Sequence, residues 1–245
     1  MGFRGKMISF VVLFIISSPN MAWPQQNSTK PQELAKWIMG IVVAKAQENE
    51  KIKRSHITYD KKVIKYNFEI NPPKIMETSI YQIYGQNGQS FEKLVQRNGQ
   101  PVRNARPEIG MADFNSILLE RYNFNLNREE LIDGRWYYVI DFRPREPIDK
   151  LPLKNRLDEG INRTAGYLYI DMEKYYLKQM KGHLIASFGK GLNIFEMQDF
   201  TFLFEQEIFE GVVVPSSIVL TYKYRVFWGE TREKLEYTYS NRRKN

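Results

Sequence analysis

Hydrophobic positions recur at helical spacing in the segment that begins near Pro31. Met39 and Val43 widen this apolar stripe beyond one helical face, so we expect the helix to be deeply buried or to cover an apolar hollow. The stripe itself is formed by Leu34, Trp37, Ile38, Ile41 and Val42.

From His56 onward the pattern changes to alternation, which is typical of a half-buried strand. The run VIKYNFEI at 63–70 alternates apolar and polar residues before two prolines interrupt it. Asn-Gly pairs at 87–88 and 98–99 stand between further alternating runs, and this pair is a strong signal for a tight hairpin. Residues 56 to 103 are therefore predicted to form a strand meander.

The alternation is lost between residues 105 and 121, where Met111, Phe114, Ile117 and Leu118 predict a short amphipathic helix. Strands resume around an Asp-Gly turn at 133–134. Residues 144 to 163 hold three prolines and many charges, which predicts a long loop that could act as a lid or binding segment. Four or five further strands are predicted from residue 166 to the C-terminus, with turns near 172–174, 190–191, 210–211 and 229–230.

Roughly ten antiparallel strands with two helices are too much sheet to stay flat. The sequence therefore predicts an α+β fold that is mostly β: a curled antiparallel sheet, or incomplete β-barrel, whose concave face is capped by the N-terminal helix and the short second helix. A partial barrel closed by helices commonly holds an apolar cavity.

The first residues have the order of a signal peptide. Arg4 and Lys6 precede a ten-residue apolar run at 7–16, and small or polar residues follow up to Ala22. Ten residues rise only about 15 Å as a helix, which is too short to cross a bilayer core of about 30 Å. We therefore expect cleavage after Ala22, a single domain over residues 23–245, and export to the periplasm or out of the cell.

The charge and the cysteine content limit the kinds of partner and metal site that the protein can have. The formal net charge of +8 becomes +6 without the signal peptide, and the basic residues are dispersed among acids except at 242–244. This pattern favours a solvated surface with transient contact to a membrane surface, and it disfavours nucleic acid. The absence of Cys excludes disulfides and thiolate metal sites.

Motifs for known catalytic chemistry are missing from the chain. There is no nucleophile elbow, zinc-protease motif or phosphate-binding loop, and two His residues cannot form a His-rich metal site. We therefore expect no enzyme activity, cofactor or metal. A carboxylate pair for glycoside hydrolysis is the weaker alternative, drawn from Asp133, Asp141, Asp158 and Asp171.

Aromatic residues are the stronger clue to function. They make up 14% of the chain, and on the strand predicted at 135–145 they occupy both faces. Such a strand either belongs to the core or lines a cavity. The residues on the face that we expect to line the cavity are Trp136, Tyr138, Ile140 and Phe142.

Four segments carry a family resemblance: IYQIYGQNGQSFEKLVQRNGQPV, the hairpin at Asp133-Gly134, GYLYID, and the strands of VVVPSSIVLTYKYRVFWGETREKLEYTYSN. Together with the order of elements, they resemble the LolA-like exported proteins related to the outer-membrane lipoprotein carriers. The resemblance covers nearly the whole mature chain and lies in hydrophobicity and turns, without a catalytic signature.

The resemblance implies a carrier that holds the acyl chains of a lipid or lipoprotein in an apolar cavity under a movable lid. It also leaves open an envelope sensor or scaffold that binds another protein, as some LolA-like relatives do. For the carrier, the expected cavity lining is Trp37, Ile41, Tyr66, Phe68, Trp136, Tyr138, Ile140 and Phe142.

Overall fold

A computed structural model describes residues 30–109, 117–148, 151, 157–190, 194–227 and 229–244. The predicted signal peptide at 1–22 lies outside these residues. The helices are α1 (Lys30–His56), α2 (Ile117–Arg121) and α3 (Leu157–Ile161). The strands are β1 (Ile57–Asn67), β2 (Lys74–Gln86), β3 (Gln89–Arg97), β4 (Gln100–Pro101), β5 (Glu108–Ile109), β6 (Tyr122–Ile132), β7 (Arg135–Pro144), β8 (Thr164–Asp171), β9 (Leu177–Leu184), β10 (Phe188–Lys190), β11 (Phe195–Phe209), β12 (Val212–Val226) and β13 (Gly229–Lys244).

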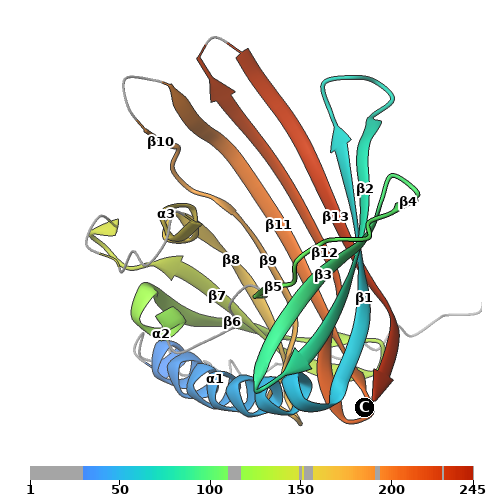
Figure 1. Ribbon diagram of the computed structural model, residues 1–245. Helices are drawn as coiled ribbons and strands as arrows, with labels where there is room; N and C mark the ends of the chain where they lie inside the picture. The colour runs from blue at the N-terminus through green and yellow to red at the C-terminus, as the bar shows by residue number, and fades with distance from the viewer. Residues whose placement is uncertain are drawn as a thin grey trace, which may run out of the picture.

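All thirteen strands belong to one antiparallel sheet with the order β4-β3-β2-β1-β13-β12-β11-β9-β8-β7-β6, in which β5 pairs with β3 and β10 with β11. In the described part of the chain β4 and β6 stand at the two ends of this order, so the sheet curls without closing. Helix α1 crosses one end of the curled sheet, and the long strands β11 to β13 extend away from it (Figure 1). The predicted fold class is confirmed.

Four hairpin turns are formed by residue pairs that end in glycine and can be recognised in the sequence. Positive φ angles occur in pairs at 87–88, 98–99, 133–134 and 210–211, and the second residue is glycine each time. Two consecutive positive φ angles define the type I′ turn, whose twist matches that of the flanking strands. The predicted meander and the Asp-Gly hairpin are therefore confirmed.

The structure differs in detail from the predictions for the loop at 144–163, the second helix and the C-terminal strands. The predicted loop at 144–163 contains the helix α3, and its residues 149–150 and 152–156 lie outside the described part. The second predicted helix is seen as α2, whereas Met111 and Phe114 also lie outside the described residues. The C-terminal part holds six strands, because the three-residue β10 gives no readable alternation.

Two hydrophobic clusters pack the inside of the protein, and the larger one fixes α1 to the sheet. The larger one packs the first half of the helix, including Ile38 and Met39, against β6 to β9, with Ile140 and Phe142 among its buried members. The smaller one joins β1, β2 and β12 at the other end of the helix through Ile57, Tyr59, Ile83, Val212 and Val214.

The buried stripe of α1 differs in phase from the predicted one. Ala35, Ile38, Met39, Val42 and Val43 are buried, whereas Leu34 and Trp37 are exposed. No helix in the described part of the chain is long and apolar enough to cross a membrane.

Candidate functional site

A cavity of about 670 Å³ lies between the second half of α1 and the inner face of the sheet. Pockets that enclose small molecules commonly measure about 300 to 1,000 Å³, so this cavity is large enough for a ligand. The residues that line it are Val42, Lys45, Ala46, Glu48, Asn49, Glu50, Ile52, Lys53, Tyr59, Ile83, Ser90, Glu92, Lys174, Tyr176, Leu177, Met180, Phe204, Gln206, Ile208, Gly211, Val213, Pro215, Ile218 and Tyr239.

The cavity follows from a change of side-chain size along α1. Val42, Ala46 and Asn49 are spaced four and three residues apart, so they lie on one face of the helix, toward the sheet. The first half of that face carries Ile38 and Met39, which fill the space above β6 to β9. Beyond Val42 this face carries the small Ala46 instead of large side chains, so the space between the helix and the sheet is not filled.

The helix is held across the cavity by a paired amide contact. The Asn49 side chain donates to the Val213 carbonyl oxygen at 2.7 Å and accepts from the Val213 amide nitrogen at 2.7 Å. A side-chain amide that uses both ends on one backbone residue mimics a strand neighbour. This contact joins the middle of the helix to the start of β12.

The end of the helix rests directly on β2. A Cβ atom at Gly85 would lie 1.3 Å from the carbonyl oxygen of Arg54, so no residue other than glycine fits without a shift of the backbone. Together with the packed first half and the Asn49 contact, this makes α1 a cover that is fixed on both sides of the cavity.

The floor of the cavity is apolar. Leu177, Met180, Phe204 and Ile218 come from three strands that meet below Ala46. Tyr239 adds an aromatic wall, and its ring meets the ring of Tyr59 edge-on at a centroid distance of 5.7 Å. Burial raises the pKa of Tyr239, so this hydroxyl stays neutral over the physiological range.

Three of the six charged residues in the lining, Glu50, Lys53 and Glu92, form ion pairs. The Glu50 carboxylate contacts Arg54 Nε at 2.9 Å and also Lys53, and Glu92 pairs with Lys61. Lys45 donates to the Lys174 carbonyl oxygen at 2.7 Å. The arrangement is an apolar hollow with a charged rim, which suits a chain-like apolar ligand with a polar end.

Three of the four carboxylates considered for hydrolysis lie in the described part of the chain, in separate local settings. Asp171 accepts the backbone N–H groups of Glu173 and Lys174 at 3.0 and 2.7 Å and so forms a turn. Asp133 lies in a type I′ turn, and Asp141 accepts from Asn127 at 3.1 Å. The side chain of Asp158 lies outside the described part. Among the described residues no three His, Asp or Glu side chains gather as metal ligands.

Three of the four residues predicted on β7 contribute to packing beneath α1. Ile140 and Phe142 are buried in the larger cluster, and Tyr138 packs against it, because the first half of α1 fills the space above them. Trp136 is 54% exposed near the end of the strand. None of the four lines the cavity.

The other four predicted residues are also outside the cavity lining. Trp37 is 56% exposed and meets Tyr175 edge-on at 6.0 Å, and Ile41 is half-buried on α1. Tyr66 lies seven residues after the cavity residue Tyr59 on the same strand, so it faces the outer side. There its ring meets that of Phe68 at 6.4 Å. Contact of any of the eight with a ligand stays a prediction.

The sequence did carry one signal for the real lining. Ala46 and Asn49 continue the buried stripe of α1 at helical spacing after Val42. Because Ala46 is small and Asn49 is polar, the sequence alone predicts that this end of the helix is exposed. The floor residues come from strands more than a hundred residues away, whose position no local pattern gives.

Comparison with protein families finds no match, and comparison with curated proteins finds no relative. Solved structures with a similar fold include a LolA superfamily protein from Nitrosomonas europaea, with 13% identity, a TM-score of 0.43, and coverage of 84% of this chain and 92% of that one. A domain assigned to outer membrane lipoprotein sorting, from Vibrio parahaemolyticus, has 11% identity, a TM-score of 0.44, and coverage of 89% and 94%. A DUF1329 family protein from Desulfovibrio piger has 10% identity, a TM-score of 0.42, and coverage of 88% and 93%.

The solved structures that the chain matches thus include LolA-like proteins, the family that the sequence resembles. All three TM-scores are below 0.5, so what this chain binds has to be inferred from its own cavity.

Proposed function

We propose that this protein is an exported carrier that holds the acyl chains of a lipid or lipoprotein in the cavity under α1. The observation that carries the proposal is the apolar hollow of about 670 Å³ beneath Ala46, closed on one side by a helix that is fixed at both ends. Export through the signal peptide at 1–22 is part of the proposal.

The binding step needs no bond to form or break. Each CH₂ group that leaves water for the apolar floor contributes about 0.8 kcal/mol, so a chain of ten such groups gains on the order of 8 kcal/mol before the cost of ordering. The polar end of the ligand would stay at the charged rim near Lys45 and Lys174. The cavity would thus hold the apolar part of the ligand, while its polar end stays in contact with water.

A cavity-filling variant tests this function. Ala46→Phe places a ring in the hollow, while Ala44→Phe places the same ring on an exposed position of the same helix. Both proteins would be purified from a bacterial periplasm, analysed by native mass spectrometry, and titrated with a fluorescent fatty acid.

We expect the native protein and Ala44→Phe to carry a near-stoichiometric acyl lipid and to bind the probe. We expect Ala46→Phe to have lost both while keeping its circular dichroism spectrum. An apo mass for the native protein that stays unchanged after incubation with lipids would contradict the proposal.

A second function is favoured by the free edge of the sheet. Strand β6 is eleven residues long and pairs only with β7 in the described part of the chain, so a partner protein could add a strand to it. Arg128, Glu129 and Glu130 place charges on this edge, which is a common protection against strand addition. Protein capture that persists in Ala46→Phe and in the absence of lipid would support this scaffold function.

A further inference from the structure

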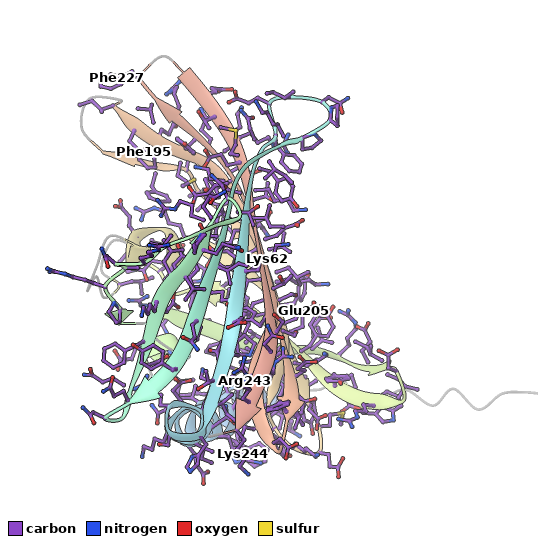
Figure 2. All side chains as sticks on the ribbon, turned by 45° about the vertical axis from the view of Figure 1, so that its right-hand side comes forward. Lys62, Phe195, Glu205, Phe227, Arg243 and Lys244 are labelled. Atoms are coloured by element: carbon purple, nitrogen blue, oxygen red, sulfur yellow. The ribbon has the colours of Figure 1, made fainter. Side chains whose placement is uncertain are left out.

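Three strand ends meet at the end of the sheet that is farthest from α1. Phe195 on β11 is opposite Val226 on β12, and Val226 is opposite Gly229 on β13. The Phe227 amide nitrogen donates to the Ile194 carbonyl oxygen at 2.9 Å, which joins the first two ends. Figure 2 shows Phe195 and Phe227 together at this end, while Arg243 and Lys244 lie at the opposite end, next to α1.

The turn between β1 and β2 completes the group. Asn67 at the end of β1 is opposite Glu233 of β13, and the Phe68 amide nitrogen donates to the Arg232 carbonyl oxygen at 2.9 Å. The loop that follows therefore projects beside the β12–β13 hairpin, as both views show (Figures 1 and 2). We call the three strand ends and the β1–β2 turn together the apolar tips.

The apolar tips expose large hydrophobic side chains to solvent. Their exposed fractions run from 38% to 58%, and they account for six of the fifteen large hydrophobic residues that are exposed in the described part of the chain. This concentration at one end is unlike the isolated exposed residues that are normal on protein surfaces. The six residues are Ile70, Ile75, Met76, Ile194, Val226 and Phe227.

The charges beside the β11–β13 tips are neutralised in pairs. Arg225 contacts Glu196 at 2.7 Å and Lys223 contacts Glu230 at 2.8 Å, each across neighbouring strands. A tip whose nearby charges are already paired loses little hydration of free charges when it enters an apolar medium. Transfer of these tips from water to an apolar medium is therefore less costly than transfer of a surface with free charges.

An aromatic track leads from the tips to the cavity. The rings of Phe195 and Tyr224 are 6.0 Å apart, and Tyr224 stacks on Tyr222 at 5.9 Å. Tyr222, two and four residues from Leu220 and Ile218, lies on the same face of β12 as the cavity residue Ile218. From Val226 to Ile218 the strand spans about 27 Å at the usual rise of about 3.3 Å per residue.

We propose that the apolar tips dock this end of the sheet on a lipid bilayer, with their side chains in the interfacial region and the aromatic track leading from the membrane surface toward the cavity. A bilayer fits because the six hydrophobic residues are distributed over several turns at one end of the sheet, and a fluid interface accommodates such a discontinuous apolar surface without the matching shape that a protein partner would need. Aromatic and aliphatic side chains are favoured in the interface, so the docking should not depend on anionic lipid. An acyl chain could then pass from the bilayer along the track to the cavity.

Vesicle flotation tests the docking. The full mature protein is mixed with vesicles of pure phosphatidylcholine and, separately, with vesicles that also contain phosphatidylglycerol. Phe227→Asn removes the ring, and Asn tolerates the positive φ of 53° at this position. Leu131→Asn is the matched control, because Leu131 is 55% exposed on the β6–β7 hairpin, away from the tips.

We expect the native protein and Leu131→Asn to float with phosphatidylcholine vesicles in low and high salt. The affinity of Phe227→Asn for these vesicles should be lower by a factor of about ten or more. Equal binding by Phe227→Asn, no binding by the native protein, or binding that needs anionic lipid and vanishes in high salt would each overturn the proposal. Fluorescent fatty acid binding by Phe227→Asn should equal that of the native protein, which separates failure of docking from failure of the cavity.

Discussion

Gly85 shows how a single residue decides where the cover of the cavity can rest. Its missing side chain lets the backbone of Arg54, at the end of α1, contact β2 directly. This contact joins α1 to β2, which follows the helix after β1. Any side chain at this position has to move the last turn of the helix away from the sheet.

We expect Gly85→Ala to lower the free energy of unfolding by about 1 to 3 kcal/mol, because the added Cβ would lie 1.3 Å from the Arg54 carbonyl oxygen. Urea denaturation followed by circular dichroism measures this change. Binding of the fluorescent fatty acid should weaken as well, since the displaced helix end opens the cavity.

Gly40→Ala is the matched control for this substitution. A Cβ at Gly40 would have no atom within 4 Å, and the residue lies inside α1. There the change from Gly to Ala should raise the free energy of unfolding by about 0.5 to 1 kcal/mol through helix propensity. Equal effects of the two substitutions would show that Gly85 is not a contact point.

At the scale of elements, α1 consists of two halves with different attachment. The first half is held by many apolar contacts, whereas the second half crosses the cavity and is held mainly by Asn49 and by its last turn. A helix that is attached in this way can open locally over the cavity without unfolding of the domain. Such an opening would admit a ligand.

Asn49→Ala should release the second half of α1. Loss of two hydrogen bonds to Val213 at 2.7 Å each should cost about 1 to 3 kcal/mol, part of it from the unsatisfied backbone groups. Amide hydrogen exchange should become faster in residues 46–56 and stay unchanged in residues 35–42. Gln47→Ala, on the exposed side of the helix, is the control, and uniform exchange along α1 in Asn49→Ala would contradict the two-part attachment.

Elements were predictable from the sequence where their cause is local. The hairpins at 87–88, 98–99 and 133–134 follow from residue pairs that adopt positive φ, and no tertiary contact is needed to specify them. The buried stripe of α1 was predicted with a shifted phase, because Leu34 and Trp37 are as apolar as Ile38. Only the sheet below the helix decides which of them is covered.

The candidate site was not predictable in the same way. Its floor joins Leu177, Phe204 and Ile218, which become neighbours through the order of β9, β11 and β12 in the sheet. The aromatic strand β7 was a reasonable expectation for the lining, and the bulk of Ile38 and Met39 above it turned that place into core. The cavity lies where α1 changes to small side chains.

At the scale of the whole molecule, buried tyrosines are spread over the sheet and make its stability sensitive to alkaline pH. Burial raises the pKa of each of these tyrosines, and it raises the pKa of Tyr137 to about 12. The other tyrosines whose pKa is raised mainly by burial include Tyr122, Tyr222, Tyr237 and Tyr239. In the unfolded chain, tyrosine has a pKa of about 10.

The direction of the effect follows from proton binding. Below about pH 10 the folded and unfolded states both keep these protons, so the free energy of unfolding does not depend on them. Above about pH 10 the unfolded state releases the protons first, and the free energy of unfolding falls by up to about 1.4 kcal/mol per pH unit for each tyrosine until its folded pKa is reached. Urea denaturation between about pH 8 and about pH 11 should show a plateau followed by a steep fall.

Tyr239→Phe should make this fall shallower by up to about 1.4 kcal/mol per pH unit, because one raised pKa is removed from the folded state. Tyr167→Phe, on an exposed side chain of β8, is the matched control for removal of a tyrosine hydroxyl from the sheet. A bound acyl chain covers Tyr239 further, so ligand should stabilise the native protein in the alkaline range at least as much as at neutral pH. If the slope of Tyr239→Phe equals that of the native protein, Tyr239 is ionised as readily as in the unfolded chain, and the wall of the cavity is open to water.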